Sequence, residues 1–117
     1  MNREIFMILG LALAGAALAL GLHLARRAAL GRAGSLASGL SHGGLGMATV
    51  LAVGAAAFTG GTLRLLNAAL LFYCLALVGG LFVLIFRLQR EPPPMFMVYL
   101  HAASAVAATF LLAIAVL

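Results

Sequence analysis

The sequence predicts an all-α integral membrane protein, folded as an up-and-down bundle of four transmembrane helices. Of its 117 residues, 66% are hydrophobic and only 8% are charged, whereas about 25% of the residues in a typical soluble domain are charged. Four apolar segments are separated by short polar stretches, and each has roughly the 20 residues that a helix needs to cross a bilayer. Backbone groups in lipid must hydrogen-bond to one another, so these segments are predicted as helices and not as strands.

The predicted spans form a single domain, and they cover residues 5–24, 40–58, 65–86 and 94–117. The second helix is expected to begin near Ser35, because serine is a favoured N-cap residue. The fourth is expected to begin at Pro93 or Pro94, because proline is well tolerated in a first helical turn. The connection between the second and third spans, residues 59–62, contains two adjacent glycines and predicts a tight turn.

Charged side chains lie at the ends of the apolar segments and predict the orientation of the chain. The connections after the first and third spans share one membrane face, and they contain Arg26, Arg27, Arg32, Arg87 and Arg90. The opposite face, with both termini, has only Arg3 and Arg64. Positive residues are enriched in cytoplasmic loops, so we expect a bacterial inner-membrane protein with both termini in the periplasm. The five arginines are expected to contact lipid headgroups. They lack interleaved aromatic residues, which excludes nucleic acid as a partner.

A shift of 59 positions aligns the two halves of the sequence without gaps and places His42 on His101. Seven further residues of the first half are then identical to their aligned residues in the second half. They are Leu11, Ala17, Leu18, Gly21, Leu22, Ala48 and Ala56. Eight identities are close to what chance gives in a chain so rich in alanine, leucine and glycine. Identity alone therefore does not establish a duplication, although the matched histidines favour one.

His42 and His101 are the candidate cofactor ligands. Each lies about seven residues into its predicted helix, roughly 10 Å along the axis. Both helices begin at the cytoplasmic face, so the imidazoles are expected at similar depth on parallel helices. Two imidazoles on facing helices can be the axial ligands of a b-type haem iron. The small residues Gly39, Gly43 and Gly46 around His42 would leave room for a flat ligand between the helices.

Other roles for these residues stay open. An intramembrane histidine can hydrogen-bond a neighbouring helix, and glycine stripes more often serve helix packing than ligand binding. His23, at the end of the first span, could join His42 and His101 in a zinc or copper site, although no carboxylate or thiol lies nearby to complete it. Tyr73 lies deep in the third span and is expected to hydrogen-bond within the bundle.

The residue inventory excludes several function classes. Glu4 and Glu91 both lie at span ends, so no acid is embedded in the membrane. The size and layout are similar to those of small multidrug-resistance transporters, but the membrane-embedded glutamate on which that family depends is missing, which argues against a proton-coupled antiporter. With no nucleophile–base pair and no phosphate-binding loop, the chain is not expected to be an enzyme on its own.

Two interpretations of function remain. The leading one is a small membrane subunit that binds one b-type haem through His42 and His101, between the second and fourth helices. It would exchange electrons with a quinone or a partner complex. The rival is a cofactor-free accessory subunit, whose small-residue stripes pack against other membrane subunits or against further copies of the chain.

Overall fold

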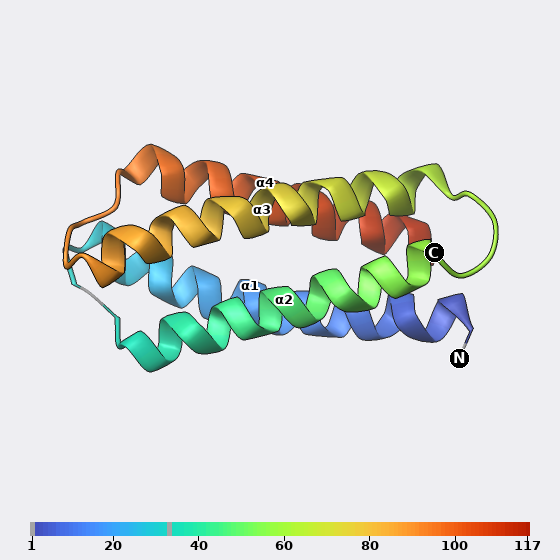
Figure 1. Cartoon of the computed structure of the whole chain (residues 1–117), viewed down its shortest axis with the longest axis horizontal. Coiled ribbons are helices and arrows are strands. Elements are labelled where there is room, and N and C mark those ends of the chain that lie inside the picture. Colours follow the sequence, from blue (N-terminus) through green and yellow to red (C-terminus); the bar gives the residue numbers. More distant parts are fainter. Residues whose placement is uncertain (1, 33) are drawn as a thin grey trace.

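The computed structural model describes residues 2–32 and 34–117, and within them it contains four helices and no strand. The helices are α1 (Arg3–Ala29), α2 (Leu36–Ala57), α3 (Arg64–Leu88) and α4 (Met95–Val116). They run up and down beside one another, with both termini at the same end of the bundle (Figure 1). The predicted all-α bundle of four helices is confirmed.

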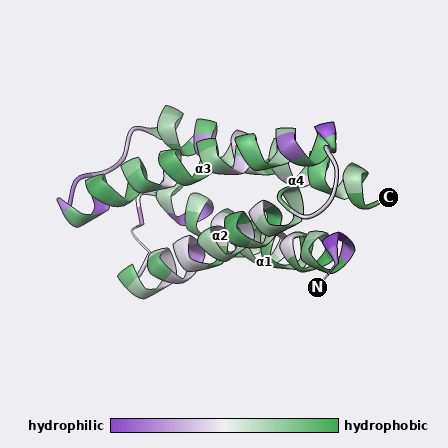
Figure 2. Cartoon of the chain, turned by 45° about the vertical axis from the view of Figure 1, so that its right-hand side comes forward, coloured by the Kyte–Doolittle hydropathy of each residue, from purple (hydrophilic) through white to green (hydrophobic). Residues whose placement is uncertain are grey.

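The helices are long enough and apolar enough to cross a bilayer. They have 22 to 27 residues, which at 1.5 Å per residue gives lengths of about 33–40 Å. The bundle measures 44 × 23 × 21 Å. Many large hydrophobic side chains are exposed on its outer surface, while hydrophilic residues gather toward the helix ends (Figure 2). Such a surface is suited to lipid, and the chain is a multi-pass membrane protein.

The helix boundaries differ from the predicted spans in ways that local chemistry explains. α1 continues six residues past His23, so this histidine lies inside the helix and not at its end. Arginines in the last turn favour this extension, because cations stabilise helix C-termini. The Oγ atom of Ser35 accepts a hydrogen bond from the backbone N–H of Ser38 at 3.0 Å, which makes Ser35 the N-cap of α2, as expected. Pro94 is the N-cap of α4 and precedes its first turn.

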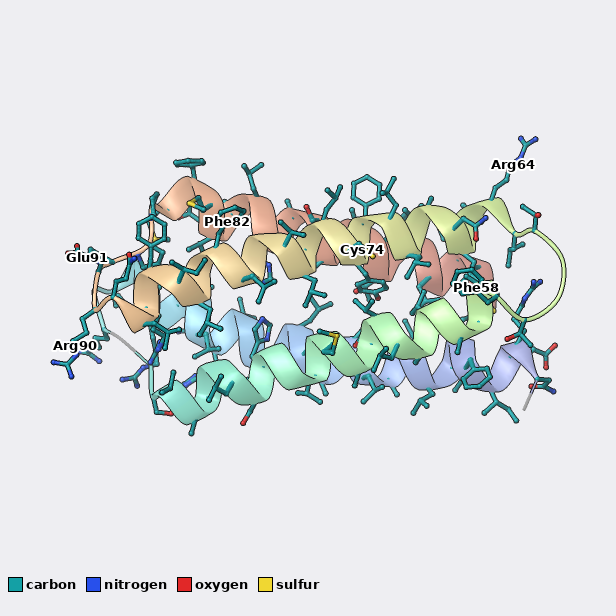
Figure 3. The ribbon with its side chains drawn as sticks, in the orientation of Figure 1. Phe58, Arg64, Cys74, Phe82, Arg90 and Glu91 are labelled. Carbon is teal, nitrogen blue, oxygen red and sulfur yellow. The ribbon has the colours of Figure 1, made fainter. Side chains whose placement is uncertain are left out.

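Each helix packs against two neighbours, in the cyclic order α1, α2, α3, α4. α1 and α3 are therefore diagonal partners, as are α2 and α4. Arg64 lies at the end that holds the termini, and Arg90 and Glu91 lie at the opposite end (Figure 3). We call that opposite end the arginine-rich end, because it holds Arg26, Arg27, Arg32, Arg87 and Arg90.

The second half of the chain repeats the geometry of the first at a spacing of 59 residues, the spacing between His42 and His101. At this spacing α2 and α4 begin and end at equivalent residues, and α1 and α3 end at equivalent residues. α1 runs parallel to α3, and α2 runs parallel to α4. A half-turn about the bundle axis therefore exchanges the two halves, which is the geometry of a parallel internal repeat.

The caps after α1 and α3 show the same repeat in finer detail. Gly31 and Arg90 occupy equivalent positions, and both are in the left-handed region, with φ of 70° and 58°. Each donates its backbone N–H to the carbonyl three residues earlier at 3.0 Å. The following N–H bonds the carbonyl five residues back, at 2.8 Å in the first half and 2.9 Å in the second. Both caps are therefore Schellman motifs, and the geometry supports the duplication that identity alone did not establish.

Candidate cofactor site

Two histidines meet in the centre of the bundle. His42 is the seventh residue of α2 and His101 is the seventh residue of α4, so the two lie at equal depth, about two helical turns from the arginine-rich end. Their helices are diagonal partners, yet the Nε2 atoms of the two rings are only 3.5 Å apart. The duplicated topology thus brings the two candidate ligands together.

The outer nitrogen of each ring is held by a backbone carbonyl. The Nδ1 atom of His42 lies 2.9 Å from the carbonyl oxygen of Ala17, and that of His101 lies 2.6 Å from the carbonyl oxygen of Ala76. In both halves the carbonyl belongs to the residue 25 positions earlier. A carbonyl oxygen only accepts hydrogen bonds, so each Nδ1 must carry the hydrogen. In a neutral ring the Nε2 atom then carries a bare lone pair.

The two Nε2 lone pairs point at each other. The ring centroids are 5.8 Å apart and the Nε2 atoms 3.5 Å apart, and the difference is about two radii of a five-membered ring. Both nitrogens therefore lie close to the line that joins the ring centres, while the ring planes are 84° apart. Two facing acceptors repel each other, more strongly in an apolar interior than in water. The arrangement is favourable only with a cation, either a proton or a metal, between the two nitrogens.

Two glycines allow the imidazoles to reach this position. A Cβ atom built on Gly21 would lie 2.8 Å from Cε1 of His42, and one built on Gly80 would lie 3.1 Å from Cε1 of His101. These glycines are equivalent in the two halves. Any side chain at either position would push the neighbouring ring away from its carbonyl, since both distances are shorter than normal carbon–carbon contacts.

A cavity of about 270 Å³ surrounds the histidine pair and is lined by all four helices. Its exposed lining residues come from α2 and α3 alone, and they are Leu40, Gly43, Gly44, Met47 and Leu81. The cavity therefore opens between α2 and α3. The glycines named from the sequence, Gly39, Gly43 and Gly46, all line it. A Cβ at Gly43 or Gly46 would meet nothing within 4 Å, so packing within the chain does not require those two residues to be glycine.

Hydroxyl groups line the far end of the cavity. The hydroxyl of Tyr73 lies 3.0 Å from Oγ1 of Thr109, which donates to the carbonyl of Ala105 at 2.8 Å. The Thr109 oxygen therefore accepts the Tyr73 hydrogen. Thr49 donates to the carbonyl of Leu45 at 2.8 Å. Each hydroxyl thus has a partner in the chain. The predicted internal hydrogen bond of Tyr73 is present, but its partner Thr109 was not identified from the sequence.

The structure does not support a three-histidine metal site. His23 is exposed on α1, and within residues 2–32 and 34–117 no group of three or more histidine, cysteine, aspartate or glutamate side chains is placed to hold a metal ion. The prediction that His23 could join the other two is therefore wrong. A half-turn of the bundle maps its position to Phe82, an exposed residue on α3 (Figure 3), so this histidine has no counterpart in the second half.

Sequence reasoning missed the contribution of the backbone to the site. Ala17 and Ala76 orient the imidazoles through their carbonyl oxygens, which every residue type possesses. The only signal was the 59-residue alignment, which matched these alanines to each other along with Gly21 and Gly80. The five arginines of the topology prediction lie outside the cavity lining, although Arg87 reaches its edge.

The chain matches no protein-family model, and comparisons with curated proteins and with solved structures give no significant match.

Proposed function

We propose that the chain binds one b-type haem, with His42 and His101 as the two axial ligands of its iron. The head-on pair of Nε2 atoms carries this proposal, because it needs a cation between the rings. Metal-bound histidines almost always donate their other N–H to a carbonyl, a carboxylate or a water, which is the state of both rings here. A haem iron also brings its own ring of four nitrogens and takes only two ligands from the protein, whereas structural zinc takes four.

The pair needs a small expansion to hold the iron. Histidine nitrogens lie about 2.0–2.1 Å from a bound metal, so two on opposite sides of an iron stand about 4 Å apart, against the 3.5 Å observed. The macrocycle is larger than the cavity, and its insertion requires Leu40, Met47 and Leu81 to turn outward. These side chains are exposed at the opening between α2 and α3, so their movement displaces only lipid.

The haem in this proposal is held without a covalent bond to the protein. The single cysteine, Cys74, is exposed on α3 and does not line the cavity. One haem at one depth cannot by itself carry electrons across the membrane. The chain therefore acts as a cofactor-binding subunit that exchanges electrons with a quinone or a partner complex near the arginine-rich end.

A reduced-minus-oxidised visible spectrum of the protein in mild detergent tests the proposal. We expect a b-type spectrum that is lost in both His42→Ala and His101→Ala, because each change removes one axial ligand. His23→Ala is the matched control and should keep the signal, since His23 is exposed on α1. A folded but colourless protein from a haem-replete host, or a signal that survives both substitutions, would contradict the proposal.

The second candidate is the cofactor-free accessory subunit, and one observation favours it. α1 presents a face of small exposed residues, Ala12, Gly15, Ala16 and Ala19. Small residues at this spacing let another membrane helix approach closely. The colourless outcome of the spectrum would favour this candidate, which needs no cation between the histidines other than a proton.

We also propose that the protein lies in a bacterial inner membrane with both termini in the periplasm. The enrichment of arginine at one end of the bundle supports this orientation. Single cysteines at the two ends test it, in a Cys74→Ala background. A membrane-impermeant maleimide added to intact cells with a permeabilised outer membrane should label Asn2→Cys and leave Gln89→Cys unlabelled. The reverse labelling pattern would invert the orientation.

A further inference from the structure

Arg87 closes one end of the cavity that surrounds the histidine pair. It lies in the last turn of α3, one turn beyond Leu84, which lines the cavity. Its side chain crosses toward α2, with Cδ and Nε each 3.9 Å from the position of a Cβ built on Gly39, another lining residue. Its Nη1 atom reaches within 4.0 Å of a Cβ built on Gly34, which precedes α2. The guanidinium therefore lies at the edge of the cavity nearest the arginine-rich end.

This guanidinium has no partner among residues 2–32 and 34–117, where it makes no hydrogen bond and no ion pair. The side chain is nevertheless half-buried. It lies between the C-terminal turn of α3, whose partial charge is negative, and the first turn of α2, whose N-terminus carries a partial positive charge. These partial charges oppose each other, so the half-buried guanidinium is left without a formal counter-charge. The surroundings thus favour a negatively charged group at this edge of the cavity.

Apart from the two histidines, the cavity offers few polar groups to a ligand. Its lining contains no arginine, lysine, aspartate or glutamate, and the hydroxyls of Tyr73, Thr109 and Thr49 at the far end already have partners in the chain. The equivalent of Arg87 in the first half of the repeat is Ala28. The two halves are alike around the imidazoles, but the first half has no cation at the position that corresponds to Arg87.

We propose that Arg87 binds the propionate carboxylates of the haem and so fixes which edge of the macrocycle faces the arginine-rich end. This inference rests on the proposed haem. Haem has two carboxylates on one edge and apolar substituents on the others, which matches a cavity with one cationic edge. Arg87 lies seven residues beyond Gly80, or about 10 Å along α3 from the level of the imidazoles. A guanidinium can bind a carboxylate through two parallel hydrogen bonds.

Comparison of haem with haem dimethyl ester, in which both carboxylates are esterified, tests the assignment. Each compound is titrated into apo-protein in mild detergent, and binding is followed by absorbance. We expect the wild type to bind haem about 10- to 100-fold more tightly than the diester, the usual effect of losing a charged hydrogen-bonded pair. Arg87→Gln should reduce this ratio to near one by weakening haem alone. Arg87→Lys should keep part of it, because the charge remains while the two-point geometry is lost.

Arg90→Gln is the matched control, since Arg90 is at the same end and is exposed. It should keep the wild-type ratio. Equal weakening of haem and diester in Arg87→Gln would overturn the assignment in favour of a packing or lipid-headgroup role for Arg87. Equal affinity of the wild type for both compounds would also overturn it. Neither result affects ligation by the histidines, whereas failure of both compounds to bind would contradict the proposed haem itself.

Discussion

Gly21 and Gly80 determine how closely the two imidazoles can approach. They provide a flat surface on α1 and α3 against which each ring packs, one turn beyond the carbonyl that holds its Nδ1–H. Glycine in a helix costs about 1 kcal/mol relative to alanine. Alanine at either position would favour the helix but would place its methyl group too close to the neighbouring imidazole. The two glycines are therefore needed for the observed positions of the His42 and His101 rings.

Gly21→Ala tests this contact. We expect it to lower the free energy of unfolding by about 1–3 kcal/mol, the usual cost of overpacking, because the new methyl group would lie 2.8 Å from the ring of His42. Gly15→Ala on the same helix is the matched control. A Cβ at Gly15 meets nothing within 4 Å, so this change should be neutral or slightly stabilising. Unfolding titrations in mixed detergent micelles measure both, and equal effects would refute the packing role of Gly21.

At the scale of the helix, the two Schellman caps use different residues for one backbone conformation. Gly31 adopts a left-handed φ without cost, whereas Arg90 adopts it with a Cβ that crowds the backbone. The two caps have the same backbone conformation at equivalent positions although their residue types differ, so the residue type does not determine this conformation. The arginine at the second cap is therefore expected to reduce stability.

Arg90→Gly should raise the free energy of unfolding by about 1 kcal/mol, which is the strain of one left-handed residue. Arg90→Ala is the control, because it removes the same charge and keeps the Cβ atom. Gly31→Ala should lower stability by a similar amount. Unfolding in mixed micelles separates the variants, and equal stabilities of Arg90→Gly and Arg90→Ala would show that the left-handed conformation costs nothing.

The connection between α2 and α3 depends on a contact far away in the sequence. Arg3, in the first turn of α1, donates from Nε to the carbonyls of Thr59 at 2.8 Å and Ala56 at 3.3 Å. Its Nη2 atom also donates to the carbonyl of Gly61. The tight turn expected at residues 59–62 thus lies in a loop that α1 helps to hold. Sequence patterns near the loop could not reveal a partner 53 or more residues away.

For the whole molecule, the fold was predictable because lipid allows so few solutions. Four apolar segments of sufficient length must be helices, and short connections make neighbours antiparallel. The equal depth of His42 and His101 in the bundle could also be deduced, since depth depends only on position along a helix. The sequence could not show which helices lie diagonally opposite each other. Their cyclic order depends on how the helices pack, and the helix faces are similarly apolar on all sides. The approach of the two Nε2 atoms depends on that order.

The opening between α2 and α3 decides how the site can be filled. In a bilayer that covers the apolar outer surface of the bundle, this opening would face acyl chains, and an apolar occupant would reach the imidazoles sideways, by diffusion in the plane of the bilayer. No helix has to leave the bundle for this exchange. The concentration that governs loading is then the amount of ligand dissolved in the membrane, where a hydrophobic molecule is strongly enriched. Within residues 2–32 and 34–117, the equivalent seam between α1 and α4 contributes no exposed residue to the cavity, so the two seams differ although the halves share one topology.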